Sequence, residues 1–329
     1  MNKDVVVVAE HFRGQLNEIT FELLGKGREV AQALGGKLIV FLLGEGAHGF
    51  TGELGAADMV WVAEAPELRE FVSDAHASWI GPKLKEATPR LVLLGSTSVG
   101  LDLLGLLSAR CGFPCLDSCV RLEPKNGAVI ATSQVYGGKV FAEVLLPEET
   151  TLVAAVPGSF APEAGRVSGN PEVQALTVPP DQPASRVAFR KLIEPPPGDV
   201  DITKVPVLVG VGRGMQNAEN LSLARDLSAA LGGAVCAARP VIDQGWLPLT
   251  RQVGKSGMKV KPKLYLAFGI SGAPEHLEGM KQSETIIAVN TDPGAPIFSV
   301  AHYGAVVDAL DLLPLLIEEI HNQSMKKAS

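Results

Sequence analysis

Short apolar runs that alternate with helix-like spans dominate the first half of the 329-residue chain. The runs with the length and composition of buried strands are Val5–Ala9, Leu38–Leu43, Met59–Val62, Leu91–Gly95 and Thr151–Val156. The spans between them, such as LNEITFELLGKGREVAQALGG, LREFVSDAHASWIGPKLKE and GLDLLGLLSARCG, carry apolar residues three and four positions apart, and glycines follow two of them. This alternation predicts a mostly parallel sheet with helices packed on its faces.

The alternation of strands and helices stops between Val120 and Leu146. There the sequence RLEPKNGAVIATSQVYGGKVFAEVLL has Asn-Gly and Gly-Gly turns between segments of alternating polarity. Turns of this kind join adjacent antiparallel strands. We therefore predict a β-meander inserted into the first domain.

A proline-rich stretch, LIEPPPGDVDITK, separates this region from a second one. Three consecutive prolines fit neither a helix nor a central strand, so the stretch reads as a linker. After it, VPVLVGVGRGMQNAENLSLARDLSAALGG starts again with a strand, a glycine turn and a helix. The sequence predicts an α/β protein of two Rossmann-like three-layer domains with mostly parallel sheets: an N-terminal domain over 1–195, a linker over 196–204 and a C-terminal domain over 205–329.

Charge and hydropathy exclude several classes of protein. The chain has 29 Lys and Arg against 36 Asp and Glu, which leaves no basic surface suited to nucleic acid. Its apolar runs are strand-sized and shorter than the roughly 20 residues of a membrane-spanning helix. Asp4 and Glu10 lie where a signal peptide needs an uninterrupted apolar core. We expect a cytoplasmic protein without membrane insertion and without a nucleic-acid partner.

The cysteines do not form a recognisable metal motif. Cys111, Cys115 and Cys119 lie in CGFPCLDSC with three residues between neighbours, and Cys236 is far along the chain. Zinc and iron–sulfur motifs usually include a gap of two residues. We predict reduced thiols and no metal site.

Glycine-rich loops in the second region carry the candidate site residues. In VGVGRGM, the alternating Gly210, Gly212 and Gly214 do not match G-x-G-x-x-G, so the loop alone is a weak phosphate signal that Arg213 strengthens. The other loops supply Arg239 in AARPVIDQG, Lys255 and Ser256 in RQVGKSGMKVKP, and Ser271, Gly272 and His276 in GISGAPEH.

Each of these residues alone also has an ordinary interpretation, such as a solvated arginine or a surface histidine. However, we expect every loop to follow a strand and all of them to meet at one edge of the sheet, where open α/β sheets bind ligands. Their backbone N–H groups, cations and hydroxyls together indicate a large anionic cofactor with a polar ring.

The stretch QVGKSGMKVKPKLYLAFGISGAPEHLEGMKQSETIIAVNTDPGAPIFSVAHYGAVVDALDLLP resembles the FAD-binding domain of the electron transfer flavoprotein alpha subunit, the family that includes the FixB proteins. The likeness continues in VGVGRGM, AARPVIDQGW and VVVVAEHFRGQLNEITFELLGKGREVAQALGG, so it covers essentially the whole chain. This resemblance implies FAD in the C-terminal domain. It also implies an N-terminal scaffold domain that packs against a beta subunit and has no cofactor of its own.

The resemblance also implies roles for single residues. Arg213 would contact a phosphate, Arg239 would lie beside the isoalloxazine, and Ser256 would lie near flavin N5. His276 would meet the O2 side of the ring, where positive charge and donors favour the negatively charged one-electron-reduced flavin. Arg239, Ser256 and His276 are thus the candidate catalytic residues. The full set of expected FAD contacts is Arg213, Ala238, Arg239, Val253, Gly254, Lys255, Ser256, Ser271, Gly272, Ala273, Pro274, Glu275, His276, Asn290 and Asp308, the last two at the adenosine.

Three positions depart from the family pattern. Lys255 and Glu275 stand where the family usually has glutamine, and Ala238 where serine is frequent. Lys255 adds positive charge near the ring or phosphates and Glu275 removes some, so these two differences bear on the flavin potential. Pro274 lies in the first turn of a helix, where proline is tolerated.

The function implied by the resemblance is electron transport without bond-making on an organic substrate. With a beta subunit, the chain would take electrons from flavin dehydrogenases, such as the acyl-CoA dehydrogenases of fatty acid beta-oxidation, and pass them to a quinone reductase or another acceptor. An alternative within the family is the electron-bifurcating form, with NADH as donor and a second FAD in the beta subunit.

The alternative from another class is a free-standing two-domain nucleotide-binding enzyme or sensor. The loop GSTSVG at Gly95 could hold a nucleotide phosphate in such a protein. An ATP-using enzyme of similar fold would, however, carry a phosphate loop rich in glycine and serine after its first strand. Here that place holds AEHFRGQLNE.

Overall fold

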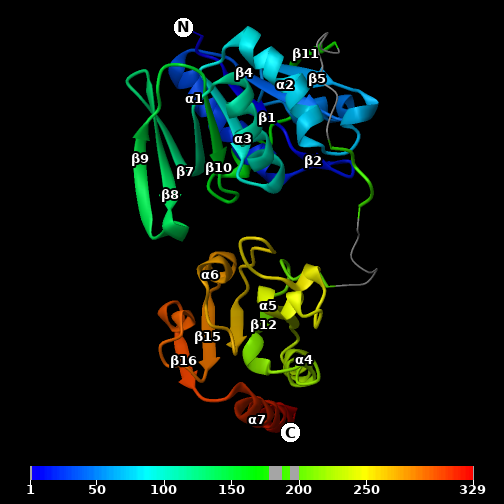
Figure 1. The fold of residues 1–329 in the computed structure, drawn as a ribbon, viewed down its shortest axis with the longest axis vertical. Coiled ribbons are helices and arrows are strands. Elements are labelled where there is room, and N and C mark those ends of the chain that lie inside the picture. The colour runs from blue at the N-terminus through cyan, green and yellow to red at the C-terminus, as the bar shows by residue number, and fades with distance from the viewer. Residues whose placement is uncertain (1, 178–186, 193–199, 329) are drawn as a thin grey trace. The chain divides into compact units, whose positions relative to one another are not determined.

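The computed structural model describes residues 2–177, 187–192 and 200–328 (Figure 1). The chain divides into two compact units, Met1–Lys191 and Leu192–Ser329, each with its own sheet and core. This mixed α/β architecture confirms the predicted fold class. The predicted boundary at residue 195 and the first four residues of the predicted linker lie outside the described residues.

The N-terminal unit is built on one large sheet. Its strands are β1 (Val5–Val8), β4 (Leu38–Leu43), β5 (Met59–Ala63), β6 (Leu91–Gly95), β7 (Cys115–Lys125), β8 (Ala128–Val135), β9 (Val140–Leu145), β10 (Thr151–Ala155) and β11 (Glu172–Ala175). Among the described residues their order is β11-β5-β4-β1-β6-β10-β7-β8-β9 (Figure 1). All neighbours from β11 to β7 pair in parallel, whereas β7, β8 and β9 pair antiparallel.

The antiparallel strands are the predicted β-meander. Asn126 and Gly127 form the two-residue turn between β7 and β8, both with positive φ (51° and 81°), which is the geometry that Asn-Gly favours. The meander starts at Cys115, earlier than the predicted Val120, because β7 also pairs with β10. Cys115 and Cys119 therefore lie in a strand.

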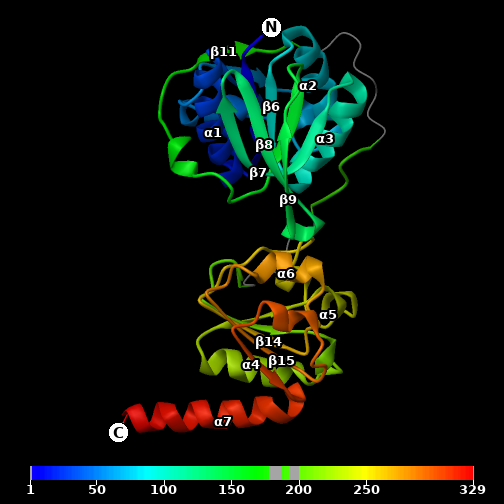
Figure 2. The same cartoon turned by 90° about the vertical axis from the view of Figure 1, so that its left-hand side faces the viewer.

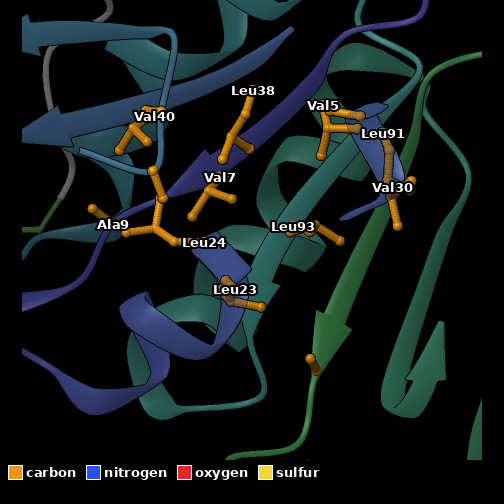
Figure 3. Close-up of a cluster of buried hydrophobic side chains, with 14 of the residues drawn as sticks. Val5, Val7, Ala9, Leu23, Leu24, Val30, Leu38, Val40, Leu91 and Leu93 are labelled. Atoms are coloured by element: carbon orange, nitrogen blue, oxygen red, sulfur yellow. The ribbon is translucent and has the colours of Figure 1, made fainter. Parts of the chain in front are cut away.

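Helices cover both faces of this sheet: α1 (Glu18–Leu34) on one face, α2 (Ser73–Ala87) and α3 (Ser98–Cys111) on the other. Val5 and Val7 of β1 pack with α1, and Figure 3 shows Val7 near Leu24 and Val5 near Val30. Val6 and Val8 join the opposite cluster with α2 and α3. An all-apolar strand is therefore explained by burial on both faces.

Two helices end at the predicted glycines, whereas one helix begins later than predicted. Gly35 after α1 and Gly112 after α3 adopt the left-handed conformation, with φ of 74° and 75°. The span predicted from Leu68 onward is helical only from Ser73, because Val72 is extended (φ −132°, ψ 114°). A short hairpin of β2 (His11–Phe12) and β3 (Gln15–Leu16) follows β1.

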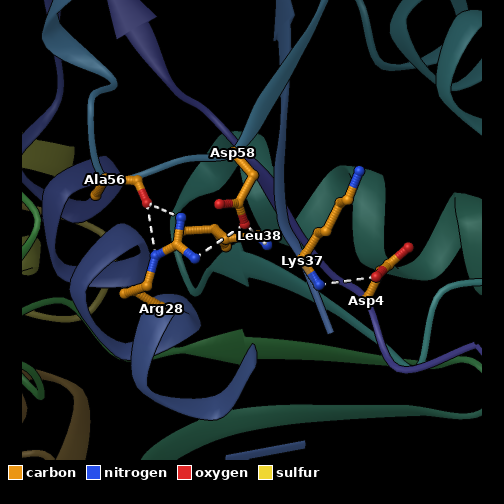
Figure 4. Close-up of polar contacts among 6 residues, drawn as sticks. All are labelled: Asp4, Arg28, Lys37, Leu38, Ala56 and Asp58. Carbon is orange, nitrogen blue, oxygen red and sulfur yellow. Dashed lines mark hydrogen bonds and ion pairs between the residues drawn. The ribbon is translucent and has the colours of Figure 1, made fainter. Parts of the chain in front are cut away.

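Polar contacts at the amino-terminal ends of β4 and β5 fix α1 to the start of β4 (Figure 4). The Arg28 guanidinium donates to the Ala56 carbonyl from Nε at 2.8 Å and forms an ion pair with Asp58 at 2.9 Å. Asp58 accepts from the Leu38 backbone N–H at 2.7 Å. These hydrogen bonds, chiefly from Arg28, hold the pKa of the Asp58 carboxyl below its usual value against the opposing effect of burial.

The C-terminal unit has a smaller, all-parallel sheet. Its strands are β12 (Val207–Val211), β13 (Ala234–Ala237), β14 (Leu264–Phe268), β15 (Thr285–Asn290) and β16 (Tyr303–Val306), and its helices are α4 (Leu221–Ala230), α5 (Arg239–Asp243), α6 (Pro274–Met280) and α7 (Ala309–Ala328). The strand order is β13-β12-β14-β15-β16. Helices α4 and α7 lie side by side on one face, and α6 packs on the other (Figure 2).

The strand order reverses at β12. The chain passes from β12 to β13 on one side and then to β14 on the other side of β12. The connection from β12 leads to α4 on one face of the sheet, whereas the connection from β14 leads to α6 on the other face, so a crevice lies at the carboxyl ends of these strands. Open α/β sheets bind ligands at such a switch point.

Within the described ranges, no helix combines the length and the apolar character needed to cross a membrane.

Candidate functional site

The loop after β12 is held against the loop after β14 by glycine backbones. The Gly212 N–H donates to the Phe268 carbonyl at 2.9 Å, and the Gly214 N–H donates to the Gly269 carbonyl at 3.1 Å. A Cβ at Gly212 would lie 2.2 Å from the Gly269 oxygen, so only glycine permits this approach. The turn leaves the Arg213 side chain exposed at the crevice.

The loop after β14 is built in the same way. Gly272 has a φ of 84°, and a Cβ there would lie 2.2 Å from the Ile297 nitrogen. The Ile297 N–H donates to the Ser271 carbonyl at 3.0 Å. Asn290, at the end of β15, donates from its side-chain amide to the Ile270 carbonyl at 2.9 Å. The Asn290 amide thus links the loops that follow two neighbouring strands.

The Lys255–Ser256 loop does not follow a strand, and that expectation was wrong. The loop lies between α5 and β14 and reaches the crevice through backbone pairing. The Val253 N–H donates to the Ala237 carbonyl at 2.9 Å, and the Lys255 N–H donates to the Glu275 carbonyl at 2.8 Å. The loop is therefore anchored to β13 and α6, which brings its cation and hydroxyl to the same edge of the sheet.

Arg239 is the first residue of α5, directly after β13 and Ala238. Its side chain is 69% exposed, and its Nε lies 3.4 Å from a carboxylate oxygen of Asp243, one helical turn away. Because the pair is exposed, this contact is weak and leaves the guanidinium available to a ligand.

His276 is buried, which excludes the surface interpretation of this histidine. Only 5% of the residue is exposed. Its Nε2 lies 3.1 Å from the Tyr265 hydroxyl and its Nδ1 lies 3.1 Å from the Val253 carbonyl oxygen. Burial lowers the pKa of His276 to about 4, against the opposing effect of the hydrogen bond to Val253, so the imidazole is uncharged at neutral pH.

These loops enclose a cavity of about 620 Å³ at the switch point. All the predicted contact residues except Pro274 line it: Arg213, Ala238, Arg239, Val253, Gly254, Lys255, Ser256, Ser271, Gly272, Ala273, Glu275, His276, Asn290 and Asp308. Pro274 instead occupies the first position of α6. The structure thus brings residues from six separate sequence segments into one site.

Four polar residues at the cavity were missed: Gln216, Asp243, Gln252 and Thr291. Asp243 could have been found, because it lies four residues after Arg239 on a predicted ligand loop. Gln252 is 4% exposed and donates to the Ser256 hydroxyl at 3.0 Å. Its burial results from tertiary packing, and no sequence pattern signals it.

The four cysteines are all free thiols, and Cys119 and Cys236 are buried. Burial raises the pKa of the Cys119 thiol to about 11. In the part of the chain that the structure describes, no group of three or more His, Cys, Asp or Glu side chains is placed to hold a metal ion.

The all-parallel sheet, the glycine loops at its switch point and the polar cavity with Arg213, Arg239 and Lys255 in its lining define a protein that binds a nucleotide-type cofactor. Two family models match the chain: the electron transfer flavoprotein domain over residues 5–181 and the electron transfer flavoprotein FAD-binding domain over residues 201–281. The second match begins just before β12 and ends at the end of α6.

Full-length relatives agree with these matches. Protein FixB of Clostridium saccharobutylicum is 37% identical over 96% of both chains. The electron transfer flavoprotein alpha subunit of Thermoanaerobacterium thermosaccharolyticum is 32% identical over 97% of this chain and 98% of its own. The LctC subunit of the lactate dehydrogenase (NAD(+),ferredoxin) of Acetobacterium woodii is 32% identical over 99% of this chain and 78% of its own. The chain belongs to the electron transfer flavoprotein alpha subunit family, and its C-terminal domain binds FAD.

The residues at the cavity fit this cofactor. Arg213 and Lys255 supply positive charge suited to a pyrophosphate, and Arg239 supplies positive charge suited to a flavin ring. The glycines at 212 and 272 let the loops pack closely around the cavity. The hydroxyls of Ser256 and Ser271 suit a polar ring or a ribityl chain. FAD supplies one-electron chemistry when bound, and the protein supplies its position and its electrostatic surroundings.

Proposed function

We propose that this chain forms a heterodimer with a beta subunit and carries electrons from flavin dehydrogenases, acyl-CoA dehydrogenases among them, to a quinone reductase or another acceptor. The observation that carries the proposal is the cavity, in which the glycine loops and cations of a FAD-binding domain meet at one switch point. The chain needs no organic substrate of its own for this role.

The proposed roles of the site residues follow from their positions and from the family resemblance. Arg213 binds a phosphate and Arg239 lies beside the isoalloxazine. Ser256 lies near N5 of the ring, with its hydroxyl oriented by Gln252, and His276 lies at the O2 side. At the other end of the cofactor, Asn290 and Asp308 contact the adenosine.

The N-terminal domain acts as a scaffold without a cofactor in this proposal. Its own switch point lies between β1 and β6, and Glu10 occupies it. The Thr97 hydroxyl donates to the Glu10 carboxyl at 2.8 Å, and a Cβ at Gly95 would lie 2.7 Å from the same carboxyl oxygen. Glu10 is 4% exposed, and burial raises its pKa. Because the Glu10 side chain occupies the space where a nucleotide would bind, the N-terminal domain is poorly suited to hold one. This argues against the free-standing nucleotide-binding enzyme or sensor.

A second candidate within the family is the electron-bifurcating form. It is favoured by the 32% identity to the LctC subunit, whose enzyme is named for both NAD(+) and ferredoxin. In that case NADH is the donor and the beta subunit carries a second FAD.

The test is to purify the chain alone and together with its beta subunit, and to measure flavin absorbance and electron transfer from an acyl-CoA dehydrogenase. The carrier role predicts one FAD per heterodimer and reduction by the dehydrogenase. Two FAD per heterodimer with reduction by NADH would select the bifurcating form. A complex that holds flavin but accepts electrons from neither donor would contradict both.

A further inference from the structure

We propose that Tyr265 is a positioning residue for His276: its hydroxyl holds the imidazole as the Nδ1–H tautomer, with both ring nitrogens bonded inside the domain. Tyr265 lies in the middle of the sheet on β14, and His276 lies on α6 above it. The hydrogen-bonded pair of Tyr265 and His276 is seen in the structure itself. Its effect on the cofactor rests on the proposed function.

The partner of Nδ1 sets the direction of the hydrogen bonds. The Val253 carbonyl oxygen, 3.1 Å from Nδ1, can only accept, so Nδ1 must carry the proton. In the uncharged ring, Nε2 is then an acceptor. The Tyr265 hydroxyl, 3.1 Å away, donates to it. Both ring nitrogens are therefore satisfied by the protein, and neither is left as a free donor to the cavity.

The surroundings keep Tyr265 in its donor form. The side chain is fully buried, and burial raises the pKa of the phenol well above its ordinary value, so the hydroxyl stays protonated. The Cys236 thiol on β13 lies 3.6 Å from the same oxygen and supplies a weak donor to it. A chain of hydrogen bonds thus runs from Cys236 through Tyr265 and His276 to Val253.

Gly210 provides the space for this hydroxyl. It lies inside β12, next to β14, and a Cβ at this position would lie 2.6 Å from the Tyr265 oxygen. The first glycine of the alternating series therefore has a different role from Gly212 and Gly214, which pack the loop at the cavity. An alanine at Gly210 would keep the Tyr265 hydroxyl and displace it.

The pair matters to the cofactor because His276 lines the cavity while its nitrogens face away from free solvent. The Tyr265 bond to Nε2 and the Val253 bond to Nδ1 together fix the orientation of the imidazole at the cavity wall, so a ligand meets a ring that is already in place. Tyr265 therefore acts on FAD through the position and tautomer of His276. A tyrosine that merely fills the core would act on FAD independently of the histidine.

The first test measures the tautomer directly in the flavin-free full chain, by nitrogen NMR with ¹⁵N-labelled histidine. The His276 signals are assigned by their loss in His276→Ala. We expect a protonated Nδ1 and an unprotonated, hydrogen-bonded Nε2. In Tyr265→Phe and in Gly210→Ala the Nε2 signal should move to that of a nitrogen without a hydrogen bond. Tyr303→Phe, at a tyrosine that is 67% exposed, should change nothing.

The second test is a double-mutant cycle on the FAD dissociation constant. Removing one hydrogen bond should weaken FAD binding about three- to tenfold in Tyr265→Phe. The same change in the His276→Ala background should have almost no further effect, because the two residues act as one unit. Additive losses would overturn the positioning role, as would a protonated Nε2 in the unmodified chain. A chain that binds no FAD at all contradicts the proposed function. In that case the tautomer measurement still shows whether Tyr265 donates a hydrogen bond to Nε2 of His276.

Discussion

The arginine at the start of α5 is the residue whose charge should matter most to the bound flavin. We predict that Arg239→Ala lowers the potential of the first one-electron reduction, because a positive charge beside the ring stabilises its negatively charged form. Since the side chain is 69% exposed, a water-like dielectric applies. The loss is then about 1 kcal/mol, or roughly 40 mV for one electron.

Asp243 provides the matched variant for this measurement. Its carboxylate lies 3.4 Å from Arg239, so Asp243→Asn should raise the same potential. Arg225→Ala, on an exposed position of α4 away from the cavity, is the control. Spectroelectrochemical titration gives all three values. Equal potentials in Arg239→Ala and the control would show that Arg239 does not lie beside the ring.

Buried His276 predicts a loss of stability in mild acid. Its pKa is about 4 in the folded chain and 6.5 as an ordinary value, so below pH 6.5 the unfolded chain binds a proton that the folded chain does not. The stabilisation is complete above pH 6.5 and is lost as the pH falls to about 4. The interval between these pKa values corresponds to roughly 3 kcal/mol.

The measurement is urea unfolding at pH 7 and pH 5 for the unmodified chain and for His276→Gln, since glutamine has no titrating group. His76 in the N-terminal unit has the same low pKa, about 4, and contributes to both proteins alike. We expect a smaller pH dependence in His276→Gln. The same pH dependence in both proteins would mean that His276 is not buried as an uncharged ring.

At the scale of elements, the glycine turns should be intolerant of a side chain. Gly272→Ala combines a φ of 84° with a Cβ that would lie 2.2 Å from the Ile297 nitrogen. Gly232→Ala has a similar φ of 65° and no atom within 4 Å of the added Cβ, so it isolates the conformational strain. We predict a loss of about 1 kcal/mol in the free energy of unfolding for Gly232→Ala and more than about 3 kcal/mol for Gly272→Ala. Denaturant unfolding of both variants checks this. Similar losses of unfolding free energy in the two variants would contradict the close packing of Gly272, in the loop after β14, against Ile297, in the segment after β15.

The buried strands were predictable because they are uniformly apolar. Residues Val5–Val8, for example, are buried on both faces of the sheet, and that state leaves a continuous hydrophobic run in the sequence. The edge strand β11 was not predicted. All four residues of β11 are exposed, so Glu172–Ala175 has neither an apolar run nor an alternation and is a strand only because it pairs with β5.

The candidate site was predictable where a loop follows a strand, as for Arg213, Arg239 and Ser271. The positions of side chains were not predictable in the same way. His276 had a surface interpretation, yet α6 packs it over Tyr265. Ser256 reached the cavity through backbone pairing of its loop with distant segments, and such long-range pairing has no local sequence signal. The contacts of these residues with FAD remain predictions.

At the scale of the whole molecule, each unit has its own sheet and its own hydrophobic core. The residues found to line the cavity, among those that the structure describes, all belong to the C-terminal unit. We predict that a fragment starting at Val200 folds and takes up FAD, with an affinity at least partly retained. Flavin fluorescence titration measures it. A folded fragment without any FAD binding would mean that the site needs the rest of the chain.

The proposed function requires this chain to carry electrons as one half of a heterodimer. Sedimentation of the chain expressed with and without its beta subunit, followed at the flavin absorbance and at 280 nm, tests it most directly. We predict a one-to-one heterodimer with tighter FAD and higher thermal stability, and a free chain that is less soluble or associates with itself. A stable monomer full of flavin that ignores added beta subunit, and still passes electrons from a dehydrogenase to an acceptor, would contradict the account.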